Sequence, residues 1–158
     1  MTISRIATAL AVIVCAFAAG CGGDDESDGG GGSGGGEATD ITKADFVKQA
    51  NQVCTEGNKA LAEAAQKLSP NGEQPSDDDL KAFATNTLIP NVKGQLEDIR
   101  AIGFPEADAD MLNDIFDDAD GVLDDLADDP EAAVSNGEDP FADINPRLTD
   151  YGLTSCAT

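Results

Sequence analysis

The stretch GFPEADADMLNDIFDDADGVLDDLADD, residues 103–129, holds the clearest periodic pattern of apolar side chains in the chain. Its apolar residues recur at spacings of three and four, which is the spacing of one face of an α-helix. They are Leu112, Ile115, Phe116, Ala119, Val122, Leu123 and Leu126. Gly103 is typical of a helix end, and Pro105 is typical of the next helix's first turn. The pattern therefore predicts a helix from Glu106 to Asp128 with one buried face.

Two further helical patterns precede this one. Thr42 is a capping residue with Asp45 as a weak capping-box partner, and apolar residues continue at helical spacing until about Ser69–Pro70. Ser76 is followed by three Asp residues, which predicts a second helix start because acidic side chains favour the positive end of a helix. Pro90 is expected to kink or break that second helix.

A shorter segment follows the periodic helix. Asp139–Pro140 and Asn145–Pro146 each provide a start, and Gly152 provides an end. The region 41–158 has the length of one domain and is rich in Ala, Leu and Asp, with few β-branched runs. The predicted fold class is all-α, a small antiparallel three- or four-helix bundle, because that arrangement buries all the apolar stripes together.

The N-terminal region indicates export. Arg5 and an apolar run precede three small residues and Cys21, a pattern typical of a signal peptide. The run is shorter than the roughly 20 apolar residues that a membrane-spanning helix needs. The stretch Ala18-Ala19-Gly20-Cys21 resembles a bacterial lipobox. The resemblance implies that residues 1–20 are cleaved and that Cys21 carries a diacylglyceryl group. The alternative is ordinary secretion, with Cys21 left free or removed.

Residues 21–40 then have the composition of a tether. They are rich in Gly, Ser and acidic residues and contain almost no apolar side chain, which predicts a disordered Gly/Asp-rich linker. Its acidic residues are repelled by anionic lipid headgroups, so the domain is expected to stand away from the bilayer. The expected location is the extracytoplasmic face of the cell membrane, with the membrane as partner through the lipid anchor.

The four cysteines divide into two pairs. Cys15 lies inside the apolar run and leaves with the signal, and Cys21 is the lipidation site. Cys54 and Cys156 remain in an exported, oxidising setting, so we predict one disulfide between them. The alternative is two buried free thiols. No CxxC motif is present, so catalytic thiol exchange is the least favoured use.

Three stretches carry a wider resemblance. TKADFVKQANQVC in the first helix, DPFAD, and YGLTSC near the end resemble small exported actinobacterial lipoproteins of unknown function. The resemblance spans nearly the whole mature chain. It implies a helical fold and the pairing of Cys54 with Cys156, and it brings no catalytic residue with it.

Charge excludes one class of partner. The chain has 31 acidic and 9 basic side chains, a formal net charge of −22, which excludes nucleic acid binding. The acidic residues gather on the periodic helix, where Asp124, Asp125, Asp128 and Asp129 lie near the negative end with nothing to offset them. These four are the candidate ligands for weak divalent cation binding, since hard cations take carboxylate oxygens. The spacing matches no EF-hand loop, so the favoured interpretation is a solvated acidic face and no metal site.

The residue inventory disfavours catalysis. The chain contains no His, which removes a Ser-His-Asp triad, an imidazole base and His-ligated metal sites. Tyr151 is interpreted as a packing residue with its hydroxyl at the surface. We therefore expect a non-enzymatic protein without cofactors. The favoured function is an interaction or structural protein with an envelope protein as partner, and the alternative is a binding module for divalent cations or a small cationic solute.

Overall fold

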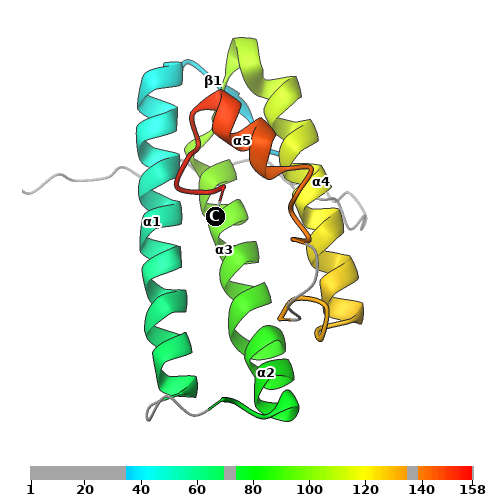
Figure 1. Cartoon of the computed structure of the whole chain (residues 1–158). Helices are drawn as coiled ribbons and strands as arrows, with labels where there is room; N and C mark the ends of the chain where they lie inside the picture. The colour runs from blue at the N-terminus through cyan, green and yellow to red at the C-terminus, as the bar shows by residue number, and fades with distance from the viewer. Residues whose placement is uncertain (1–34, 70–73, 135–138, 158) are drawn as a thin grey trace, which may run out of the picture. The chain divides into compact units, whose positions relative to one another are not determined.

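The structure is a computed structural model that describes residues 35–69, 74–134 and 139–157 (Figure 1). The predicted signal peptide, Cys21 and residues 21–34 of the predicted tether lie outside these ranges. The described residues are mostly helical and contain one disulfide, as the sequence predicts. In chain order the elements are β1 (Ala38–Thr39), α1 (Lys43–Leu68), α2 (Asp77–Phe83), η1 (Ala84–Leu88), α3 (Ile89–Ile102), β2 (Phe104–Pro105), η2 (Glu106–Asp108), α4 (Ala109–Asp128) and α5 (Asn145–Tyr151).

Two helix starts use the same capping arrangement. The Thr42 hydroxyl accepts a hydrogen bond from the Asp45 backbone N–H at 3.2 Å and donates one to the Asp45 carboxylate at 2.7 Å. Ser76 makes the same pair of bonds with Asp79, at 3.2 Å and 2.6 Å. Each side chain satisfies a backbone donor that has no partner inside the helix, and this fixes where α1 and α2 begin.

Pro90 shapes the helical path without ending it. The chain continues from α2 through η1, a π-helical turn, and into α3, where Pro90 occupies the first turn. Proline has no N–H and its ring crowds the carbonyl four residues earlier, so a widened turn just before Pro90 relieves both problems. The expected kink or break is therefore a π-helical turn between two helices.

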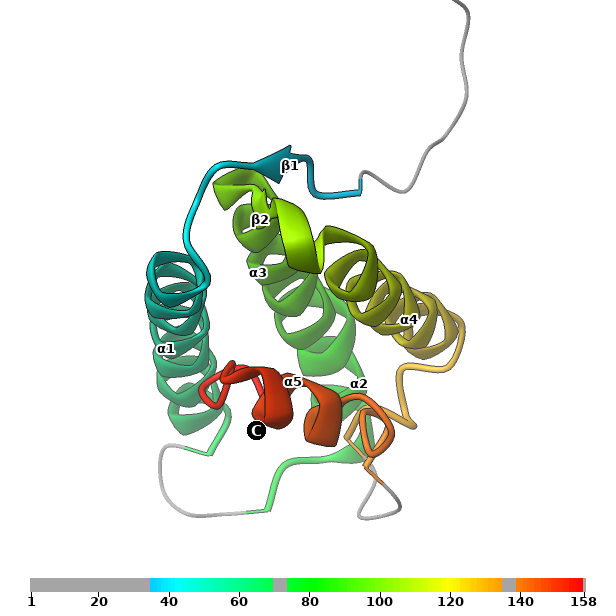
Figure 2. The same ribbon diagram turned by 90° about the horizontal axis from the view of Figure 1, so that it is seen from above.

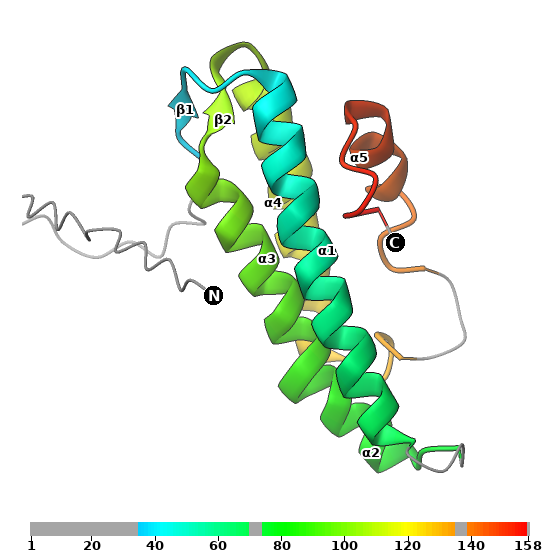
Figure 3. The same ribbon diagram turned by 90° about the vertical axis from the view of Figure 1, so that its left-hand side faces the viewer.

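Helices α1, α3 and α4 lie side by side, with contacts between α1 and α3 and between α3 and α4. The short helix α5 closes the side between α1 and α4 (Figures 1 and 2). Figure 3 shows α5 beside the half of the helices that is nearer to β1 and β2.

A two-stranded parallel sheet, which the sequence analysis did not predict, joins the start of the domain to the α3–α4 turn. Ala38 pairs with Phe104 and Thr39 with Pro105. Ahead of β1, the Gly36 N–H donates to the Asn113 side-chain oxygen on α4 at 3.0 Å. Gly36 also lies against the Phe104 ring, where a Cβ atom would clash. Residues 35–40, which the sequence analysis assigned to the tether, therefore include part of the folded domain.

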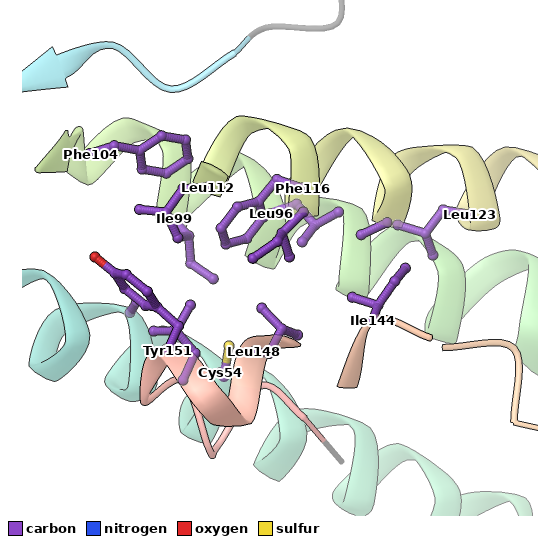
Figure 4. Close-up of a cluster of buried hydrophobic side chains, with 14 of the residues drawn as sticks. Cys54, Leu96, Ile99, Phe104, Leu112, Phe116, Leu123, Ile144, Leu148 and Tyr151 are labelled. Atoms are coloured by element: carbon purple, nitrogen blue, oxygen red, sulfur yellow. The ribbon is translucent and has the colours of Figure 1, made fainter. Parts of the chain in front are cut away.

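The core of the domain lies between the helices. Phe46, Phe104 and Phe116 are at most 1% exposed, and Figure 4 shows part of this cluster. The Phe104 ring meets Phe46 edge-on and stacks on Phe116, with centroids 5.5 Å apart in both pairs. Among the described residues, no helix is both long enough and apolar enough to cross a bilayer.

Candidate functional site

One face of α1 holds the C-terminal tail. The Asn51 amide donates to the Gly152 carbonyl at 2.8 Å and accepts from the Ser155 N–H at 2.8 Å. The Asn58 amide donates to the Ser155 carbonyl at 2.8 Å. Between them, Cys54 forms the predicted disulfide with Cys156, with the Cα atoms 5.1 Å apart. Asn51, Cys54 and Asn58 recur at three and four residues, so all three face the tail.

The tail can reach this face because α5 ends in a sharp turn. Gly152 has a φ of 109°, in the left-handed region, and its N–H bonds to the Leu148 and Thr149 carbonyls. Glycine adopts this backbone conformation at low cost, and it reverses the chain direction. The sequence identified Gly152 as a helix end and Cys156 as the bridge partner. The tail-binding role of Asn51 and Asn58 was not predicted. The one sequence signal for it is that both residues lie at helical spacing from Cys54.

Beside the disulfide, the domain contains an apolar cavity of about 250 Å³. Its walls come from α1, α3, α4, α5 and the segments on either side of residues 135–138. The apolar lining residues are Cys54, Leu61, Leu88, Val92, Leu96, Ile99, Phe116, Ala119, Leu126, Ala133, Pro140, Phe141, Ile144, Leu148 and Cys156. Figure 4 shows Leu148 facing Leu96 across the space between α5 and α3. Helical proteins hold ligands in cavities of this kind, between facing helices.

The polar groups that line the cavity are few. Among the described residues they are Asn58, Gln95, Asp139 and Asn145, and none of the described lining residues is basic. The Asp139 carboxylate accepts from the Phe141 N–H at 2.9 Å and from the Asn145 amide at 2.8 Å. These bonds hold the chain before α5 in one geometry and keep a carboxylate at the cavity's edge. In the described part of the chain, the cavity therefore combines an apolar interior with the negative group of Asp139.

Gln95 forms part of the wall on the α1–α3 side. Its side chain is 9% exposed, and its amide donates to the Asn91 side-chain oxygen at 2.7 Å. A Cβ atom at position 57 would overlap the Gln95 side chain, so a larger residue there would require that side chain to move. Gln95 also lines a second, more open hollow with Val53, Glu56 and Asp98. Its side chain therefore separates the apolar cavity from this polar surface hollow.

The acidic helix α4 is partly neutralised by other elements. The Lys93 ammonium lies 2.7 Å from the Asp124 carboxylate. The Arg100 guanidinium lies 3.1 Å from Asp117 and 2.8 Å from Asp120, with its side chain only 8% exposed. Arg147 pairs with Asp118. The local sequence of α4 shows no basic residue, so the expectation that nothing offsets Asp124 is wrong, because α3 packs Lys93 against it.

The structure does not gather the candidate cation ligands into a cage. Asp124, Asp125, Asp128 and Asp129 are exposed on the last turns of α4 and just after it. Within residues 35–69, 74–134 and 139–157, no group of three or more Cys, Asp or Glu side chains is placed to hold a metal ion. Cation binding at these four residues stays a prediction.

Tyr151 ties α5 to the start of α4. Its hydroxyl donates to the Asp108 carboxylate at 2.8 Å, and its ring lies 3.8 Å below the Lys43 ammonium. Tyr151 is 6% exposed. Burial, then the hydrogen bond and the negative charge of Asp108, raise the pKa of the Tyr151 phenol above its ordinary value. The expected packing role is correct, and the hydroxyl, which was expected at the surface, donates to Asp108 in a partly buried position.

Comparison with protein-family models, with curated proteins and with solved structures finds no significant match to this chain.

Proposed function

We propose that the chain is an exported, lipid-anchored protein of the cell envelope that presents a non-catalytic helical domain for interaction on the extracytoplasmic side. The disulfide between Cys54 and Cys156 is the observation that carries this proposal. Structural disulfides form and persist in oxidising compartments and are rare in the cytosol. The lipobox-like stretch that ends at Cys21 supplies the matching export signal and anchor.

The anchor and the domain have separate roles in this proposal. Two or more acyl chains at Cys21 hold the protein on the membrane, since one chain alone binds only marginally. The tether joins a small antiparallel helical bundle, and the bonds of Gly36 to Asn113 place that junction beside α4. The acidic side chains of the tether and of α4 favour a domain held off an anionic bilayer surface.

A non-catalytic role is supported by the chemistry of the side chains. The chain has no His, and the proposal uses its four Cys residues in the signal, the anchor and the disulfide. An envelope protein is the proposed partner, and nucleic acid is excluded by the net charge of −22. Among the described residues, no specific contact favours the alternative of divalent cations as ligands.

The experiment is metabolic labelling with a fatty acid in a bacterium that processes lipoproteins. The chain is expected to take up label and to sediment with membranes. Cys21→Ser is expected to abolish the label. Cys15→Ser is the matched control, because it changes a cysteine six residues earlier that is removed with the signal, and it is expected to keep the label.

The same cells report the compartment of the domain. Alkylation without reductant is expected to modify no thiol of the processed chain, and reduction is expected to expose two, Cys54 and Cys156. Label that persists in Cys21→Ser, or two alkylated thiols in the unreduced chain, would contradict the proposal.

A further inference from the structure

We propose that the apolar cavity beside the disulfide is a binding site for a small amphipathic amine, with an apolar body in the cavity and an ammonium group at the Asp139 edge. The site is built from described residues of α1, η1, α3, α4 and α5, of the segments on either side of residues 135–138 and of the C-terminal tail, and it does not depend on the lipid anchor. Its existence can be tested whether or not Cys21 is acylated.

The size of the cavity sets the size of the ligand. An apolar cavity of about 150 Å³ stays dry and takes up benzene, a molecule of six non-hydrogen atoms. By proportion, a cavity of about 250 Å³ accommodates roughly ten. Apart from Asn58, Gln95, Asp139 and Asn145, the described lining consists of aliphatic side chains, two half-cystines and the rings of Phe116 and Phe141, so the buried part of the ligand must be mostly apolar. Water gains few hydrogen bonds in such a space.

The mouth of the cavity sets the polarity of the ligand. Leu61, Leu88, Val92 and Phe141 are half-buried, so the cavity is reached from the side where these side chains meet solvent. Asp139 lies at that edge, and each of its oxygens accepts one hydrogen bond from the protein. A carboxylate oxygen has two lone pairs, so each keeps capacity for another donor. None of the described residues that line the cavity is basic, so none of them favours an anionic headgroup.

The charge of the whole chain points to the same headgroup. With 31 acidic and 9 basic side chains, the chain attracts cations and repels carboxylates and phosphates. A short-chain fatty acid fits the apolar interior and fails at the charged edge, and a phospholipid is too large for the cavity. An amine with a short aliphatic body satisfies both conditions.

A second feature indicates that the cavity has a stable shape. The wall near α5 is fastened to α1 by the disulfide and by the bonds of Asn51 and Asn58 to the tail. On the opposite wall, the Arg100 pairs with Asp117 and Asp120 hold α4 to α3. Preformed walls reduce the ordering that a ligand must impose when it binds.

The test uses the full chain with Cys21→Ser, so that no acyl group is attached to compete for the cavity. The probes are nonylammonium, 1-nonanol and nonanoate, which share one aliphatic body and differ in head charge. Calorimetric titration is expected to show one saturable site for nonylammonium, weaker binding of the alcohol, and binding of nonanoate at least about tenfold weaker than that of the amine. At about 100 times its dissociation constant, nonylammonium is expected to raise the melting temperature by roughly 10 °C.

Two pairs of variants locate the site. Ala119→Leu fills the cavity from α4 and is expected to abolish binding of all three probes, whereas Gly121→Ala, on the same helix with open space around it, is expected to leave binding unchanged. Asp139→Asn is expected to reduce the affinity for nonylammonium by about threefold to fivefold while sparing 1-nonanol. Asp143→Asn removes the same charge from an exposed position that does not line the cavity and is expected to change neither affinity.

Several outcomes would overturn the proposal. They are nonanoate binding as tightly as nonylammonium, equal losses with Asp139→Asn and Asp143→Asn, and unchanged binding by Ala119→Leu. If circular dichroism shows that Ala119→Leu does not fold, Ala133→Leu fills the same cavity from its edge and is judged by the same criterion.

Discussion

The two ends of the domain are built from the same helices and packed differently. At the aromatic end, defined by Phe46, Phe104, Phe116 and Tyr151, the rings contact one another and each is at most 6% exposed. At the cavity end, defined by Leu61, Leu88, Val92 and Phe141, the side chains are half-buried around an open space. One end provides a close-packed interior, and the other leaves space for a ligand.

The difference arises from side-chain size and from what covers the helices. Three phenylalanines and one tyrosine fill the aromatic end, and β1 brings Gly36 against the Phe104 ring. Along the cavity, α4 and the turn after it contribute Ala119 and Ala133, which are too small to reach the opposite wall. Close packing is the rule in protein interiors, so a lined space of this size distinguishes the cavity end from the aromatic end.

The largest expected effect comes from removing the disulfide, which fastens the cavity end to α1. The cysteines are 102 residues apart, and closing a loop of that length stabilises the folded state by about 4 to 5 kcal/mol in the chain-entropy account. We expect Cys54→Ala with Cys156→Ala to lower the free energy of unfolding by about that amount, measured by urea denaturation and circular dichroism.

Hydrogen exchange on the same double variant shows which helices lose stability. The amides of α5 are expected to exchange faster than those of α4, because the tail loses its covalent link while the Arg100 ion pairs remain. Equal acceleration in both helices would break the distinction between the two ends. A change below about 1 kcal/mol would contradict the loop-closure argument.

A matched pair of Phe→Ala substitutions compares the packing of the two ends directly. Phe104→Ala removes a fully buried ring and is expected to cost about 3 to 5 kcal/mol. Phe141→Ala removes a half-buried ring beside an existing space and is expected to cost about 1 to 2 kcal/mol. Denaturant unfolding of both variants measures the difference. Equal costs would show that the cavity end is as closely packed as the aromatic end.

The sequence predicts the helices well because their signals are local. Thr42 and Ser76 cap helices at their predicted positions, Gly103 and Gly152 end them, and the apolar stripe of α4 is buried along its length. Such signals depend on neighbours within one turn or two of helix. The pairing of Cys54 with Cys156 was also accessible, because elimination left only two cysteines.

The features that the sequence does not predict all depend on distant residues. The pairing of β1 with β2 joins Ala38 to Phe104, and two residues carry no strand pattern of their own. Lys93 and Asp124 meet only because α3 packs on α4. The cavity is the clearest case. The sequence identifies Ala119 as an apolar helix residue, but it does not show whether a ring or an empty space lies next to that residue. A cavity forms only when several segments pack together, so no single segment of the sequence predicts it.

The smallest expected effect concerns the bond that closes the aromatic end, from the Tyr151 hydroxyl to Asp108. Burial and Asp108 raise the pKa of the phenol above its ordinary value of 10.0, so the native state holds the phenolic proton more tightly than the unfolded state does. This contribution to stability is therefore complete below about pH 10 and is lost as the pH rises further. Tyr151→Phe removes it and is expected to cost about 1 kcal/mol at neutral pH.

The pH dependence distinguishes the bond from simple packing. As the pH rises from about 8 to about 11, the difference in unfolding free energy between the wild-type chain and Tyr151→Phe is expected to shrink, because only the wild type has a phenol to ionise. Asp108→Asn is the matched control, since it keeps a hydrogen-bond acceptor and removes the charge, and its pH dependence is expected to be weaker than that of the wild type. A constant difference over this range would mean that Tyr151 stabilises the aromatic end through its ring alone, which contacts Phe46 edge-on and lies below Lys43.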